Sequence, residues 1–176
     1  MTDALWYFGR GTGAAALLLL SLSTALGIAT SAGRPLPGLP RFAVTALHRN
    51  ASLTASVFLI IHIGTLFLDP YAQLKLLDRV VPWLGEYRPF WLGLGTLAFD
   101  LIIAVVVTSL LRQRIGLRAW RAVHWFAYAT WPVGLLHALG TGTDNTALWM
   151  WFVAALSVVV VAGAFVWRFV PTGVKV

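Results

Sequence analysis

Cysteine is absent from the 176-residue chain, and methionine occurs only at Met1 and Met150. The absence of cysteine excludes disulfides, thiolate metal ligands and iron–sulfur clusters held by this chain. Histidine is therefore almost the only side chain with which the protein could bind a redox metal deep in a membrane.

Charged residues are also scarce. They make up 11% of the chain, against 59% hydrophobic residues, and the mean hydropathy is +0.81. These values lie outside the range of soluble globular domains and indicate a membrane protein. Apolar runs of about 20 residues with at most one charged residue each, long enough to cross a bilayer, occur at 12–30, 43–68, 90–111, 120–139 and 147–166.

The expected fold is an all-α transmembrane bundle with five spans, forming a single domain over residues 1–176. Backbone polar groups must find internal partners in lipid, and the alternating pattern of a membrane barrel is absent. Glycines such as Gly93, Gly95, Gly134 and Gly163 would let helices approach closely, but they indicate no function by themselves. Little chain remains for a soluble domain, so flavin or nicotinamide chemistry would come from another chain.

The net charge of +7 does not indicate nucleic-acid binding, because the basic residues are distributed by side. By the positive-inside rule, the side with more lysine and arginine residues is cytoplasmic. This places the amino terminus outside and the carboxyl terminus inside. The larger group contains Arg34, Arg41, Arg49, Arg112, Arg114, Arg118, Arg121, Arg168 and Lys175. The smaller group contains Arg10, Lys75, Arg79 and Arg88.

A cleaved signal peptide is the alternative for the first run, because Arg10 precedes apolar residues that end in small ones at 30–33. Cleavage would leave an even number of spans and move the arginine-rich turn outside, against the positive-inside rule. The segment 71–88, between the second and third spans, mixes apolar and charged residues at helical spacing. It predicts a short amphipathic surface helix, with a plain linker as the alternative.

All four histidines fall in two of the predicted spans: His48 and His62 in the second, His124 and His137 in the fourth. These spans run in the same direction, so His48 matches His124 in depth near the cytoplasmic side, and His62 matches His137 toward the outside. At about 1.5 Å per residue, separations of fourteen and thirteen residues correspond to roughly 20 Å along each helix.

Two levels of paired imidazoles suit two haems, because a porphyrin iron has two axial positions that histidines from facing helices can fill. We therefore predict two haem b groups, one held by His48 with His124 and the other by His62 with His137. The alternatives are packing histidines or a zinc or copper site. A small ion has bonds of about 2 Å, so the two levels could not share one.

The rotation of the side chains fits less well than their depth. Around the helix axis, fourteen residues leave two side chains roughly 40° apart, whereas thirteen leave them roughly 140° apart. The fourth span therefore needs a distortion between its histidines. Trp131-Pro132 predicts a kink there, because an interior proline removes a backbone hydrogen bond.

The motifs LHRN and IIHI, followed by WRAVHWFAYATWPVGLLHALGTGTD, resemble the ferric reductase-like transmembrane domain family. This family includes ferric reductases, NADPH oxidases and the haem-binding membrane subunit of the periplasmic methionine sulfoxide reductase system. The resemblance extends over nearly the whole chain, and the histidine spacing is its most specific part. It implies that the chain is a compact family member in a bacterial plasma membrane. It also implies that two haems b are ligated by His48, His62, His124 and His137.

The chain departs from larger family members because it lacks the FAD and NADPH domain and has five predicted spans where six are common. The resemblance therefore implies separate partners. The electron donor would be a cytoplasmic flavoprotein or a membrane quinol. The acceptor would lie outside the membrane and be ferric iron or a flavoprotein.

Three further residues are candidates for contact with the cofactors. Arg49 follows His48 and Arg121 precedes His124 by three positions, so their guanidinium groups could pair with haem propionates. Membrane topology and snorkelling explain these arginines equally well. Asp100 lies in the middle of the third span, where a carboxylate is costly. It could hydrogen-bond a ligand histidine or relay a proton, or it could be a protonated structural residue.

The sequence thus predicts an oxidoreductase component that passes electrons across the plasma membrane, with haem supplying the redox chemistry. One alternative is the haem b subunit of a quinol-linked dehydrogenase complex. A second is a haem-free transporter or assembly factor whose histidines line a pathway.

Overall fold

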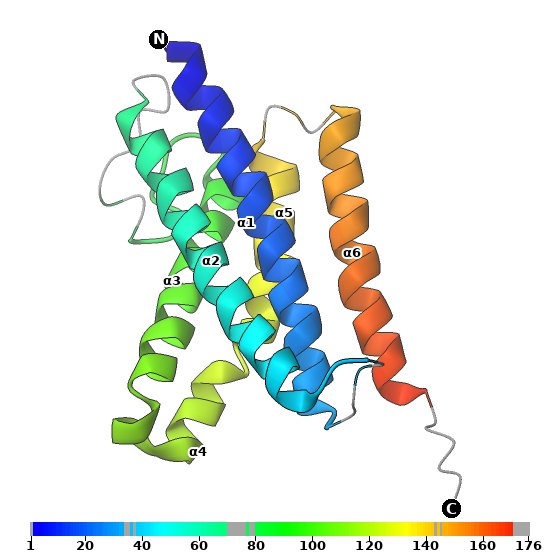
Figure 1. Cartoon of the computed structure of the whole chain (residues 1–176). Coiled ribbons are helices and arrows are strands. Elements are labelled where there is room, and N and C mark those ends of the chain that lie inside the picture. Colours follow the sequence, from blue (N-terminus) through cyan, green and yellow to red (C-terminus); the bar gives the residue numbers. More distant parts are fainter. Residues whose placement is uncertain are drawn as a thin grey trace, which may run out of the picture.

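The computed structural model describes residues 2–33, 36, 38–69, 77, 80–142, 144 and 146–170, and its elements are helices (Figure 1). Their bounds are α1 (Thr2–Ser31), α2 (Arg41–Leu68), α3 (Pro89–Leu110), α4 (Arg112–His124), α5 (Ala127–Thr141) and α6 (Leu148–Phe169). Four of them, α1, α2, α3 and α6, are long and apolar enough to cross a membrane. The prediction of an all-α, multi-pass protein is confirmed.

Helix α1 occupies the middle of the bundle. It packs along α2 and also against α6 and α5, while α3 packs against α5 and α4. Half of the buried apolar side chains in the described residues are alanines, as at Ala16, Ala29, Ala55 and Ala154. In lipid, large apolar side chains gain little by turning inward, and small ones let helices approach closely. Leu148 is accordingly 87% exposed on the outer surface.

The predicted fourth span, 120–139, is divided between α4 and α5 at Trp125 and Phe126. Both residues keep right-handed helical dihedral angles, but the hydrogen bonds tighten to the i→i−3 pattern. The N–H of Phe126 donates to Val123 (3.0 Å) and the N–H of Ala129 donates to Phe126 (2.9 Å). Pro132 lies inside α5. The interruption is therefore nearer His124 than the predicted kink at Trp131-Pro132.

A glycine turn sends the chain from α3 back toward the bundle. Gly116 has φ 81° and ψ 160°, a conformation that divides α4 and is open essentially to glycine alone. The last two turns of α4 then pack against the end of α3, where the Trp120 indole donates a hydrogen bond to Ser109 (3.2 Å). The Arg112 guanidinium lies 5.4 Å from the centre of the same ring. This turn fixes the position of His124, the last residue of α4.

Only part of the segment 71–88 is described. Residues 80–88 form turns and bends, and the rest of the predicted amphipathic helix lies outside the described residues apart from Leu77. The Trp83 ring packs so closely on Gly93 that a Cβ there would lie 2.4 Å from it. Arg88 donates a hydrogen bond to the carbonyl of Gly140 (2.7 Å). The described part of this segment therefore ties α3 to the end of α5.

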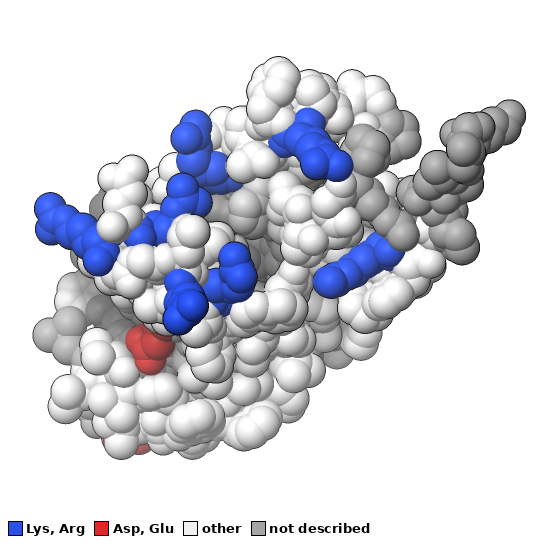
Figure 2. Space-filling view, turned by 90° about the horizontal axis from the view of Figure 1, so that it is seen from below, with Lys and Arg blue, Asp and Glu red and all other residues white. Residues whose placement is uncertain are grey.

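Basic side chains gather at one end of the bundle, where α4 and the last turn of α6 lie (Figure 2). We call this end the arginine-rich face. Its described members are Arg41, Arg49, Arg112, Arg114, Arg118, Arg121 and Arg168. The opposite end holds Arg10 and Arg88 together with Asp69, Glu86 and Asp144, and Arg10 forms an ion pair with Asp144. The separation of charge predicted from the sequence is thus present in the fold.

Replacing Gly116 with alanine is expected to destabilise the fold by about 1–3 kcal/mol, because a Cβ strains this backbone conformation. Equilibrium unfolding of the protein in detergent measures the change. Gly163→Ala in α6 is the control, because a Cβ there meets nothing within 4 Å. Equal stability of the two variants would contradict the assignment of Gly116 as a required turn.

Candidate functional site

The four histidines lie on two groups of helices that face each other. His48 and His62 are on α2, His124 ends α4, and His137 is on α5. In Figure 1, α2 and α5 run in the same direction, from the arginine-rich face toward the opposite end. Among the described elements α2 packs extensively only on α1. The two groups therefore approach each other through side chains rather than through closely packed backbones.

The lower pair, nearer the arginine-rich face, consists of His48 and His124. Their ring centroids are 6.2 Å apart and their planes are nearly perpendicular, at 81°. An iron with two imidazole ligands places the ring centres about 6 Å apart, given metal–nitrogen bonds of about 2 Å and about 1.2 Å from nitrogen to ring centre. The observed separation therefore fits two axial ligands of one iron.

The upper pair consists of His62 and His137, more than three helical turns away from the lower pair. Within the described ranges, no three histidine, aspartate or glutamate side chains gather around a point that could hold a metal ion. Each level instead offers two imidazoles, which is the number of axial positions on a porphyrin iron.

Backbone carbonyls hold the histidines of the upper pair. His62 donates its Nδ1–H to the carbonyl of Gly9 in α1 (2.7 Å), and His137 donates to the carbonyl of Trp91 in α3 (2.9 Å). Thr141 Oγ1 lies 3.1 Å from the same nitrogen of His137. A carbonyl oxygen can only accept, so Nδ1 carries the proton in both rings. The lone pair of Nε2 is then free for a metal.

His48 belongs to a closed hydrogen-bonded loop. Its Nδ1–H donates to the carbonyl of Ser23 (2.8 Å), and the Ser23 hydroxyl lies 3.3 Å away. Ser52 donates to the carbonyl of His48 (2.7 Å), so the 2.6 Å contact between the two serine hydroxyls is a bond from Ser23 to Ser52. The loop again leaves Nε2 of His48 as the free nitrogen.

His124 is the exception. Its buried Nδ1 has no hydrogen-bond partner in the described part of the chain. The ring packs instead on the indole of Trp120, with centroids 4.9 Å apart and planes tilted by 30°. The identity of its metal-facing nitrogen is therefore not fixed by a neighbour, unlike that of the other three.

The tightened turn at 125–126 reduces the rotational mismatch between His124 and His137. A residue in an i→i−3 turn rotates the helix by about 120° rather than about 100°. Three such residues would reduce the offset from roughly 140° to roughly 80°. The interruption between α4 and α5 thus acts in the direction needed to bring both side chains toward α2.

The other predicted site residues are less closely engaged. Arg49 and Arg121 are exposed on the arginine-rich face, and neither forms an ion pair or hydrogen bond within the described residues. Asp100 is partly buried on α3 and also lacks such a partner there. The structure brings His48 and His124 together and places His62 and His137 farther along α2 and α5. No hydrogen bond joins Asp100 to a histidine within the described residues.

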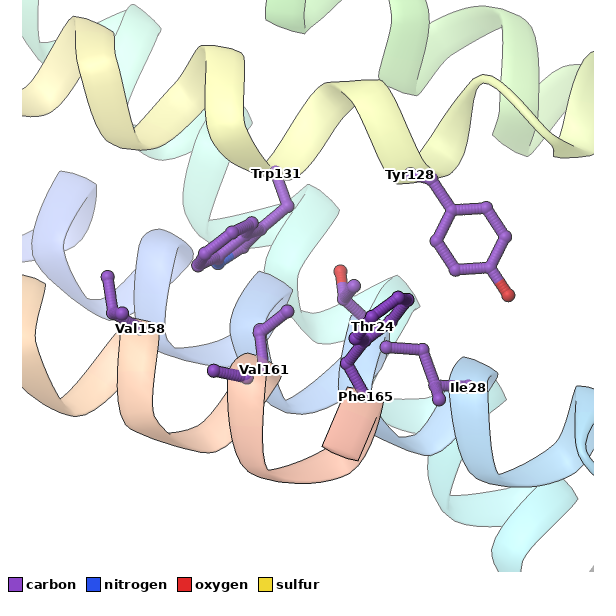
Figure 3. Close-up of a pocket in the computed structure, with 8 residues that line it drawn as sticks. Thr24, Ile28, Tyr128, Trp131, Val158, Val161 and Phe165 are labelled. Carbon is purple, nitrogen blue, oxygen red and sulfur yellow. The ribbon is translucent and has the colours of Figure 1, made fainter. Parts of the chain in front are cut away.

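A separate cavity of about 370 Å³ lies between α1, α5 and α6 (Figure 3). Its wall is almost wholly apolar and includes Ile28, Trp131 and Phe165. None of the four histidines lines it. This cavity is distinct from both histidine levels.

Sequence reasoning missed the groups that hold the rings. Ser23 and Ser52 were not singled out, and a backbone carbonyl leaves no trace in a sequence. The one available signal was the spacing Gly9-x-x-x-Gly13 and Ser23-x-x-x-Gly27, a pattern of small residues that marks close helix approach. It indicates a contact without naming what makes it.

Comparison with protein families gives a match to the model described as "Ferric reductase like transmembrane component" over residues 12–135. The matched region contains His48, His62 and His124 and ends two residues before His137. Comparison with curated proteins and with solved structures gave no match.

Proposed function

The chain belongs to the ferric reductase-like transmembrane family, and from this we propose that it is a di-haem b protein that carries electrons across a bacterial plasma membrane. The observation that carries the proposal is the contact between the imidazoles of His48 and His124, with His62 and His137 farther along α2 and α5. In the lower pair the ring separation of 6.2 Å suits one iron. In the upper pair, Nδ1 of each ring donates to a carbonyl, which leaves Nε2 of each ring with a free lone pair.

His48 and His124 would hold one haem, and His62 and His137 the other. Bound haem would supply a one-electron Fe(III)/Fe(II) couple. The chain itself would supply the ligand nitrogens; α1 and α3 orient the rings of His48, His62 and His137. The two levels, roughly 20 Å apart along α2, would divide a hydrocarbon core about 30 Å thick.

In this proposal the arginine-rich face is cytoplasmic, in agreement with the positive-inside rule. The helix pair α4 and α5 would act as one of five spans, although each is too short to cross alone. The amino terminus would then lie outside and the carboxyl terminus inside.

Electrons would enter at the arginine-rich face from a cytoplasmic flavoprotein or a quinol, and leave near His137 toward ferric iron or a flavoprotein outside. Arg49 and Arg121 are exposed beside the lower pair, where guanidinium groups could pair with haem propionates.

Single histidine replacements test the ligand pairs. Purified full-length protein is expected to bind about two haems per chain with a low-spin haem b spectrum. We call the haem at the upper pair the outer haem and the haem at the lower pair the inner haem. His62→Ala and His137→Ala should each remove the outer haem, because each replacement leaves that haem with one axial ligand. His48→Ala and His124→Ala should each remove the inner haem for the same reason. Haem content and redox titration measure this.

Thr45→Ala, at an exposed position on α2, is the matched control and should keep both haems. Folded but colourless wild-type protein, made with ample haem, would contradict the proposal and favour a haem-free transporter. Loss of the inner haem in His62→Ala would contradict the pairing.

Asp100→Asn is expected to leave the midpoint potential of the outer haem unchanged. His62 and His137 already donate their N–H to carbonyls, so neither ring has an N–H left to donate to this carboxylate. Potentiometric titration of wild type and variant checks the expectation. An outer potential that moves on substitution would show that Asp100 does act on that pair.

A further inference from the structure

Three histidine hydrogen bonds share one geometry. Each acceptor carbonyl belongs to a residue four positions before a glycine in the same helix, and that glycine lies against the same imidazole. The sets are Gly9 and Gly13 with His62, Ser23 and Gly27 with His48, and Trp91 and Gly95 with His137. A Cβ at Gly13, Gly27 or Gly95 would lie 2.9, 3.3 or 2.4 Å from the ring.

The spacing of four follows from helix geometry. In a helix the carbonyl of residue i already accepts the N–H of residue i+4. The Cβ of residue i+4 points back toward the amino terminus and covers the turn that contains this carbonyl. A glycine at i+4 removes that cover. The second lone pair of the oxygen then becomes reachable by an imidazole from a neighbouring helix.

We propose that Gly13, Gly27 and Gly95 are positioning residues: each opens a helical carbonyl to the Nδ1–H of a ligand histidine and so directs Nε2 to the metal. The inference rests on the proposed function for its metal, but the hydrogen bonds themselves do not depend on it. A histidine that donates Nδ1–H to a carbonyl is also a more electron-rich ligand.

Other helical glycines show that this geometry is not a general result of helix packing. A Cβ at Gly11, Gly64 or Gly163 meets nothing within 4 Å. At Gly93 and Gly140 the close neighbours are the indoles of Trp83 and Trp91. Among the helical glycines that the structure describes, only the three placed one turn after a histidine-binding carbonyl lie against an imidazole.

The levels differ in how they are anchored. Both rings of the upper pair have a carbonyl partner, whereas in the lower pair only His48 has one and the buried Nδ1 of His124 has none within the described residues. Replacements at Gly13 and Gly95 should therefore act on the outer haem alone. A replacement at Gly27 should act on the inner haem alone.

Alanine replacements in the full-length, haem-loaded protein give the first test. The effect should follow the closeness of the added Cβ, with Gly95 largest, Gly13 next and Gly27 smallest. Gly95→Ala is expected to lower haem content from about two to about one per chain. Gly13→Ala and Gly27→Ala should raise the midpoint potential of the outer and inner haem respectively, because a weaker Nδ1–H bond makes a poorer ligand for Fe(III).

Gly11→Ala, Gly64→Ala and Gly163→Ala are the matched controls and should leave both haems and both potentials unchanged. Equal effects in the two sets of glycines would overturn the inference. So would an unchanged outer haem in both Gly13→Ala and Gly95→Ala.

A second test needs neither haem nor a variant. Nitrogen-15 NMR of histidine in full-length protein made without haem reports which ring nitrogen carries the proton. His48, His62 and His137 should each show a protonated Nδ1 and a bare Nε2. Protonation of Nε2 instead of Nδ1 at any of the three would overturn the inference. Failure of wild-type protein to bind haem would contradict only the proposed function.

Discussion

A buried imidazole N–H inside a membrane has no water to bond, so another part of the protein must accept it. Here the acceptors are carbonyls of neighbouring helices. His48 and His62 bond to α1, and His137 bonds to α3. These are the same partners against which α2 and α5 pack. The bonds that orient the histidines therefore join helices into two units, α1 with α2 and α3 with α5.

Histidines from α2 and from the segment of α4 and α5 meet at the lower pair, where the ring centroids of His48 and His124 are 6.2 Å apart. Helix α2 has little backbone contact with α4 and α5, so side chains such as those of His48 and His124 make the contact between them. The tightened turn at 125–126 lets one chain segment supply a histidine to each level. Gly116 brings that segment back against α3 so that His124 reaches His48. Each local irregularity thus acts on the position of a histidine.

The sequence predicted four spans well, because a helix that crosses the hydrocarbon core needs about 20 apolar residues in a row, and such runs can be found in a sequence directly. It also predicted that His48 and His124 lie at the same depth, since rise per residue is constant, and their ring centroids are 6.2 Å apart. It placed the distortion at Pro132 rather than at Trp125 and Phe126, because a switch from i→i−4 to i→i−3 bonds depends on tertiary packing. The glycines were assigned to helix packing alone, because which side chain faces a glycine is decided by another helix.

The central claim is that two haems lie between these units, each held by one histidine from α2 and one from the segment of α4 and α5. An electron cryomicroscopy structure of the purified, haem-loaded protein tests this most directly. The account predicts two porphyrins with irons roughly 20 Å apart along α2, ligated by His48 with His124 and by His62 with His137. A single porphyrin, or an iron ligated by two histidines of the same helix, would contradict it.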